Sequence, residues 1–203
     1  MSRIILLAAT AALALSACQK KDAAPNAADP GTSNTAVNAT QDAAGAAVGA
    51  TSAATLGQVS TDAFVSNAAI SDQYEIQAGK IAEAKASSPA VKSFGNMMVT
   101  DHMAMASAMK PLITAAGKTP PPGLDERRKG MIDNLNAATA GDFDKTYLSQ
   151  QEAVHNEALS LMKGYADHGD NPGLKAAASK SVAKVQAHLD HVKQLETGSA
   201  GAR

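Results

Sequence analysis

The stretch FDKTYLSQQEAVHNEALSLMKGYADHGDNP, residues 143–172, decides the fold because it contains one long helix together with its end. Its apolar side chains recur at spacings of four and seven residues, which places them on one helical face: Phe143, Tyr147, Val154, Leu161 and Tyr165. The run Gly169-Asp170-Asn171-Pro172 then supplies a stop, a cap residue and a proline suited to the first turn of another helix. The stretch therefore predicts two consecutive helices joined by a tight turn.

Working outward, the same periodicity predicts the other helices. We expect long helices over residues 61–86, 89–116 and 172–196, and a short one over 125–138 that follows the stiff connector Lys-Thr-Pro-Pro-Pro-Gly. Ser88 is a natural cap, with Pro89 at the first helical position. Four long amphipathic helices, with a short extra helix between the second and the third, predict an all-α four-helix bundle over residues 60–197. We expect residues 198–203 to be a disordered tail.

The N-terminal residues have the organisation of a secretory signal. Arg3 supplies the positive charge, Ile4 to Leu15 form an apolar run of 12 residues, and Leu15-Ser16-Ala17-Cys18 resembles the lipobox of bacterial lipoproteins. A run this short does not span roughly 30 Å of hydrocarbon as a helix. We expect residues 1–17 to be a lipoprotein signal peptide and Cys18, the only cysteine in the chain, to be lipidated.

Residues 18–59 are rich in Ala, Thr, Asn and Gly and have few large apolar side chains. Such a segment buries too little surface to offset its ordering entropy, so we expect a disordered tether behind the lipid. The predicted location is the bacterial cell envelope, with the lipid in a membrane, most simply the outer membrane facing the periplasm.

Charge and motifs exclude several functions. Of the 18 basic side chains, 17 remain after removal of Arg3, against 19 acidic ones, and no basic stripe favours nucleic-acid binding. The sequence has no nucleophile elbow and no phosphate-binding glycine loop, so we predict no catalytic residues, no enzymatic activity and no firmly assigned cofactor. We expect a non-enzymatic binding or structural module, with an envelope protein or a cell-wall component as its partner.

Several short segments resemble one bacterial family at matching spacing. They are Phe64-Val65, Ser71-Asp72 with Glu75-Ile76 and Gly79-Lys80, Met98-Val99-Thr100-Asp101-His102, Phe143-Asp144 with Tyr147 and His155, and His188-Leu189. This set resembles the family catalogued as domain of unknown function 4142, often labelled a predicted outer-membrane protein. The resemblance covers about residues 61–195. It implies a ferritin-like helical bundle in a secreted or lipid-anchored protein, and it implies no activity.

Ferritin-like di-iron bundles use a Glu on each of two helices and a Glu-x-x-His pair on each of the other two. This chain has one complete pair, Glu152 with His155, whereas valine stands three residues before His102 and three before His188. A full di-iron centre therefore lacks its ligands.

A single transition-metal ion is the simpler metal hypothesis. The candidate ligands lie near the middle of the predicted long helices: Glu75, Asp101, His102, Glu152, His155 and His188. Imidazole and carboxylate groups suit Zn, Fe or Cu, and the methionines around His102 raise the alternative of Cu(I), although they also fit a packing stripe. A second interpretation needs no ion, because buried imidazoles and carboxylates can also satisfy one another in a closed hydrogen-bond network. The alternative function is thus metal binding linked to envelope metal or stress handling.

Overall fold

The computed structural model describes residues 60–200, which form five α-helices. These are α2 (Thr61–Lys85), α3 (Pro89–Ala115), α4 (Glu126–Ala137), α5 (Phe143–His168) and α6 (Pro172–Ala200). Every predicted helix is present, and the described part of the chain contains no strand. The predicted all-α class is therefore confirmed.

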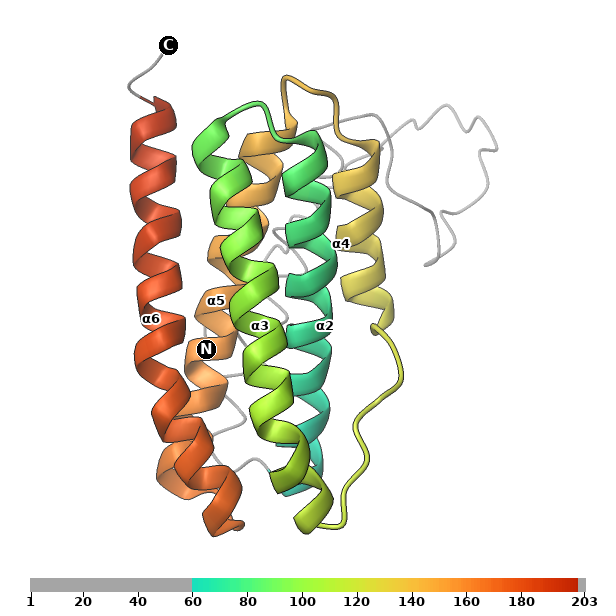
Figure 1. Cartoon of the computed structure of the whole chain (residues 1–203), viewed down its shortest axis with the longest axis vertical. Coiled ribbons are helices and arrows are strands. Elements are labelled where there is room, and N and C mark those ends of the chain that lie inside the picture. Colours follow the sequence, from blue (N-terminus) through green and yellow to red (C-terminus); the bar gives the residue numbers. More distant parts are fainter. Residues whose placement is uncertain (1–59, 201–203) are drawn as a thin grey trace, which may run out of the picture.

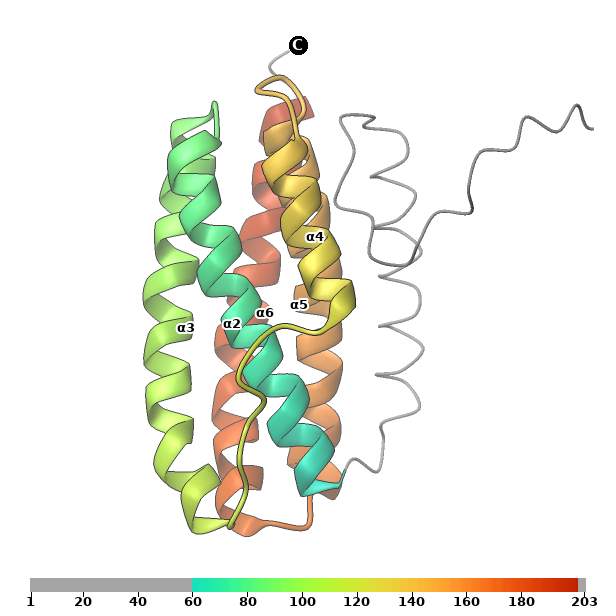
Figure 2. The same ribbon diagram turned by 90° about the vertical axis from the view of Figure 1, so that its right-hand side faces the viewer.

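The four long helices form a bundle of two antiparallel hairpins, α2 with α3 and α5 with α6 (Figure 1). A long crossover leaves the lower end of α3, passes across α2 and leads upward into α4, which packs beside α2 and α5 (Figure 2). As a result α3 and α5 run in the same direction. The helix order is up, down, down, up, with a single long crossover, the kind of connection that ferritin-like folds use.

Local side chains fix where the helices begin. Capping side chains accept a backbone N–H at three of these starts: Ser60 from Ala63, Asp125 from Arg128 and Asn171 from Leu174. The predicted Ser88 cap is different, because its hydroxyl makes no capping bond. The carboxylate of Asp144 instead accepts the backbone N–H groups of Ser87 and Ser88 at 2.9 and 2.8 Å, which ties the start of α3 to the first turn of α5.

The α2–α3 hairpin is close enough to require glycine at two facing positions. A Cβ atom added to Gly79 would lie 2.6 Å from the carbonyl oxygen of Gly95, and one added to Gly95 would lie 2.8 Å from that of Gly79. Neither helix backbone can shift without disturbing the hairpin. The glycine pair therefore sets a close spacing between α2 and α3, and side chains of both helices meet inside the bundle.

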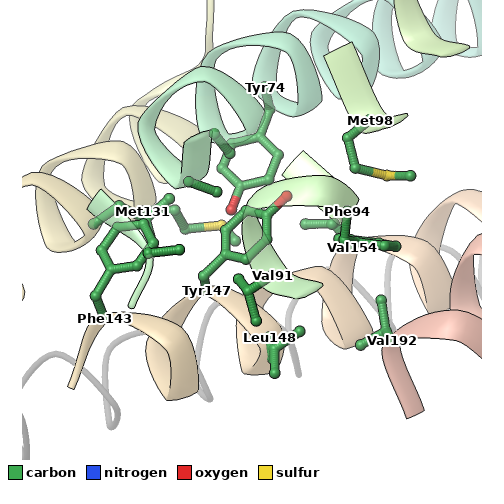
Figure 3. Close-up of a cluster of buried hydrophobic side chains, with 14 residues drawn as sticks. Tyr74, Val91, Phe94, Met98, Met131, Phe143, Tyr147, Leu148, Val154 and Val192 are labelled. Carbon is green, nitrogen blue, oxygen red and sulfur yellow. The ribbon is translucent and has the colours of Figure 1, made fainter. Parts of the chain in front are cut away.

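Two apolar clusters fill the core. The upper cluster consists of Tyr74, Ala78, Ala82, Ala86, Val91, Phe94, Met98, Met131, Leu135, Phe143, Tyr147, Leu148, Val154 and Val192 (Figure 3). The lower cluster consists of Phe64, Val65, Ala68, Met109, Ile113, Ala158, Leu161, Met162, Tyr165, Leu174, Ala178 and Val185. Met98 and Met109 are buried among these side chains, in keeping with the packing interpretation of the methionine stripe.

Some predicted boundaries differ from the structure or lie outside it. α6 continues to Ala200, past the predicted domain end at residue 197, because no proline interrupts the backbone ladder after Thr197. The predicted signal peptide, the lipidated Cys18 and the tether lie outside the described residues, as do residues 201–203. Among the helices that the structure describes, none has the length and apolar character needed to cross a membrane.

Candidate metal centre

A polar layer separates the two apolar clusters at mid-height of the bundle. On α3 the layer is His102, between Met98 of the upper cluster and Met109 of the lower one. On α6 it is His188, between Val192 above and Val185 below. The helical spacing that places these neighbours in the core also points the two imidazoles inward. His155 on α5 completes the layer, and the three rings are only 1–3% exposed.

The three imidazoles converge on one another. Their ring centroids are 5.4–6.0 Å apart. One ring nitrogen from each of His102, His155 and His188 lies within 4.8 Å of the other two. These three residues form the histidine layer. Bound transition metals lie about 2.0–2.1 Å from imidazole nitrogens, so three nitrogens this close can reach one ion with small side-chain adjustments.

Carboxylates hold the outward nitrogens of two histidines. His102 Nδ1 lies 2.8 Å from Asp72 Oδ1, and His188 Nε2 lies 2.8 Å from Asp101 Oδ2. Asp101 also accepts from Lys184 Nζ at 3.1 Å, which connects the bond to the surface. Metal-binding histidines characteristically use their second nitrogen in this way, because the carboxylate fixes both the orientation and the tautomer of the ring.

A backbone carbonyl holds the third histidine. His155 Nδ1 donates to the carbonyl oxygen of Gln151, one helical turn earlier, at 2.8 Å. A carbonyl oxygen only accepts, so in the neutral ring the proton is on Nδ1 and Nε2 carries a lone pair. The same reasoning places lone pairs on the inward nitrogens of His102 and His188, since their outward nitrogens face carboxylates.

Among the described residues, the inward nitrogens have no hydrogen-bond partner. His102 Nε2, His155 Nε2 and His188 Nδ1 are buried and unpaired. When all three rings are neutral, these nitrogens are acceptors with no donor between them, which leaves a buried polar requirement that the described side chains do not meet. This is the result that the closed-network interpretation did not predict. Hydrogen bonds occupy the outward nitrogens of the three rings, and the arrangement of the unpaired inward nitrogens suits a cation.

Electrostatics also favours neutral imidazole in part of the layer. Burial, together with the neighbouring His102 and His188, lowers the pKa of His155 to about 3. Burial also lowers the pKa of His188, in spite of its bond to Asp101. His102 is the exception. Burial opposes its protonation, but the hydrogen bond to Asp72 and the charge of Glu75 outweigh that effect and raise its pKa. Neutral rings are the form that binds a metal.

A second group of polar side chains lies against the layer. Glu75 is 1% exposed and accepts from Gln151 Nε2 at 2.7 Å, and its Oε1 lies 3.7 Å from His155 Nδ1. Burial raises the pKa of Glu75, which favours its neutral form. The carboxyl therefore approaches the outward side of His155, and it is not in the group of converging ligand atoms.

The other predicted acidic ligands have different positions. Asp101 contacts the outward side of His188, so it positions the ring and does not face the centre. Glu152 is partly exposed on α5 and does not belong to the converging group, although it lies three residues before His155.

Sequence reasoning missed the two remaining partners, Asp72 and Gln151. Asp72 lies three residues before Glu75 and so shares its helical face, and this spacing was a signal that could have found it. The contribution of Gln151 is its backbone carbonyl, which no side-chain motif reveals.

The fold and the layer define a class of protein, an all-α bundle with a histidine-lined position in its core. The family model described as Domain of unknown function (DUF4142) matches residues 45–195, and the chain belongs to this family. The resemblance inferred from the sequence is confirmed, and the match begins earlier than expected, within the predicted tether. No curated protein and no solved structure matches the chain. The family has no assigned function, so a functional argument rests on the layer itself.

Proposed function

We propose that this protein binds one divalent transition-metal ion through His102, His155 and His188. The observation that carries the proposal is the set of three inward lone pairs, each fixed by a hydrogen bond on the opposite side of its ring. Imidazole nitrogen suits Zn²⁺, Cu²⁺ and Fe²⁺, and three protein ligands leave a further coordination position for a small molecule.

The surrounding charges favour a bound cation. Asp72 and Asp101 place two carboxylates directly behind the ligands, and Lys184 offsets part of the charge of Asp101. Burial raises the pKa of Glu75, which disfavours a further negative charge beside His155.

We extend the proposal to the place of action. A signal peptide over residues 1–17 and a lipid on Cys18 would anchor the chain to an envelope membrane, with the bundle held at the end of the tether. The support is the order of charge, apolar run and Leu-Ser-Ala-Cys in the sequence. In this setting the protein acts by holding a metal, and an envelope protein or a cell-wall component is its proposed partner.

Metal analysis of tag-free protein tests the binding proposal directly. Protein stripped with a chelator is titrated with Zn²⁺, Cu²⁺ and Fe²⁺, and calorimetry should give one ion per chain for at least one of them. His155→Ala should lose this site. His191→Ala is the matched control, since this fourth imidazole lies one turn from His188 but outside the converging group, and it should retain one ion. A wild-type protein that binds none of the three ions would refute the proposal.

Membrane fractionation tests the anchor separately. Expressed with its full N-terminus in a bacterial host, the chain should sediment with membranes, and Cys18→Ser should release it. A variant that stays in the membrane fraction would contradict lipid anchoring without affecting the metal proposal.

A further inference from the structure

A cavity of about 410 Å³ opens beside the histidine layer, between α2, α3 and the crossover. Its wall is mainly apolar and includes Ala68, Ala69 and Ile76 of α2 with Ala106, Met109 and Ile113 of α3. A volume of this size with few polar groups is typical of a site for a small molecule. The cavity shares Asp72 with the metal proposal, which makes no use of the apolar wall.

The end of α3 positions the outer wall. Gly117 has a φ of 67°, and two backbone bonds close a Schellman turn, from Gly117 N to Thr114 O at 3.0 Å and from Lys118 N to Ile113 O at 3.1 Å. The proline-rich crossover then lies across α2, where Gln73 Nε2 donates to the carbonyl oxygen of Pro121 at 3.0 Å (Figure 2). The cavity is therefore a slot closed on one side by a stiff segment.

The polar groups of the slot indicate the charge of its ligand. Asp72 is hydrogen-bonded to His102, and Lys118 forms an ion pair with Asp62 at 2.7 Å. Lys110 is the remaining charged side chain of the lining, and within residues 60–198 it has no ion-pair partner. Lys110 is thus the charged side chain of the slot that is left to pair with a ligand, next to a wall that is mainly apolar.

We propose that the slot binds the alkyl chain of a medium-chain carboxylate, whose headgroup pairs with Lys110. An apolar chain gains free energy by displacing water from the alanine, isoleucine and methionine wall. The carboxylate complements the ammonium group, which remains at the exposed mouth where both charges stay partly hydrated. This site is separate from the metal proposal, and metal-free protein also binds the ligand.

Decanoate, titrated into metal-free protein by calorimetry below its micelle concentration, tests this site. Wild-type protein should bind one molecule. Ala106→Leu, which fills the slot, should weaken binding at least tenfold, and Lys110→Gln should weaken it severalfold. Ala104→Leu is the matched control, because it adds the same volume to an exposed position of α3 outside the lining, and it should bind as the wild type does.

Two further ligands separate the contributions of chain and headgroup. Decylamine has the same chain with the opposite charge and should bind at least tenfold more weakly than decanoate. Acetate has the headgroup without the chain and should give no measurable heat. The proposal is overturned if decanoate does not bind, if decylamine binds as tightly, or if Ala104→Leu weakens binding as much as Ala106→Leu does. Helical circular dichroism of each variant confirms that a loss of binding is not a loss of fold.

Discussion

Two of the polar clusters in the bundle satisfy their hydrogen bonds in opposite ways. Near the lower end, the Thr61 hydroxyl lies 2.6 Å from the Tyr165 hydroxyl, and both donate to Asp170. This lower network is closed, and its outermost member faces solvent. At mid-height, the histidine layer is bonded outward on every ring and unpaired inward on every ring.

The difference teaches how a structural polar cluster can be told from a binding site. In the lower network a carboxylate of one residue terminates the hydrogen-bond chain, so folding alone completes it. In the histidine layer the carboxylates of Asp72 and Asp101 and the carbonyl of Gln151 are on the outer side, and they hold the three rings with their unpaired nitrogens toward each other. A cluster that only stabilised the fold would gain by turning one ring to donate inward. In the observed arrangement, the described residues leave the three inward nitrogens unpaired.

The largest expected effect is a change of stability on metal binding that depends on the histidine layer alone. At a free Zn²⁺ concentration one hundred times the dissociation constant, the free energy of unfolding should rise by about 2.7 kcal/mol. His188→Ala should abolish this rise, and Tyr165→Phe in the lower network should retain it. Thermal melts with Zn²⁺ and with a chelator measure the difference. An equal rise in His188→Ala would mean that zinc stabilises the fold from elsewhere.

A smaller effect is expected when the outward hydrogen bonds are weakened. Asp72→Asn and Asp101→Asn keep the shape of the side chain but remove its charge, and the loss of a carboxylate that holds a metal-binding imidazole typically costs 10–100-fold in metal affinity. Asp62→Asn is the control, since this exposed carboxylate pairs with Lys118 and not with a histidine. Competition with a chromophoric chelator gives the affinities. If both core variants bind as tightly as the control does, these carboxylates do not position the ligands.

The pH dependence of the stability of the metal-free protein tests the burial of the histidine layer. The pKa of His155 is about 3 in the folded state, against 6.5 for an unperturbed histidine. Below pH 6.5 the unfolded chain therefore binds a proton that the folded chain excludes, and stability should fall by roughly 1 kcal/mol per pH unit from this residue. The lowered pKa of His188 acts in the same direction. The raised pKa of His102 adds no slope below pH 6.5, because both states are then protonated.

Urea unfolding in a chelator at pH 7.0, 6.0 and 5.0 measures this slope. His155→Gln should show a shallower fall than the wild type, because the excluded proton is gone, while the carboxylates that titrate elsewhere remain the same in both proteins. If the free energy of unfolding falls equally with pH in the two proteins, His155 accepts a proton in the folded state, and water reaches the layer more than its burial indicates.

The sequence predicted the helices well because their signals are local. Spacing of apolar residues, the Gly169-to-Pro172 boundary and the stiff prolines act within a few residues of chain, and the bundle followed from them. The three histidines were found for the same reason, since the core-facing sides of α3, α5 and α6 each contain one. Which side of each imidazole ring faces the centre of the layer was not predictable. Whether Asp101 faces the centre of the layer or the outward nitrogen of His188 depends on how α3 and α6 are rotated about their axes relative to each other. No local sequence pattern determines this rotation.

The smallest expected effect lies in the lower network. Tyr165 stacks on Phe64, with ring centroids 3.9 Å apart, and Tyr165→Phe keeps this contact while it removes the hydroxyl. Thr61 still donates to Asp170, so no buried donor is left unpaired, and the loss should be about 1 kcal/mol. Thr61→Val removes the central hydroxyl and leaves Tyr165 bonded to Asp170 alone, with a similar cost. Urea unfolding measures both, and the double variant should lose less than the two single losses added together, because the two hydroxyls share one acceptor. Strict additivity would show that the hydroxyls act independently and that the lower network is not a closed unit.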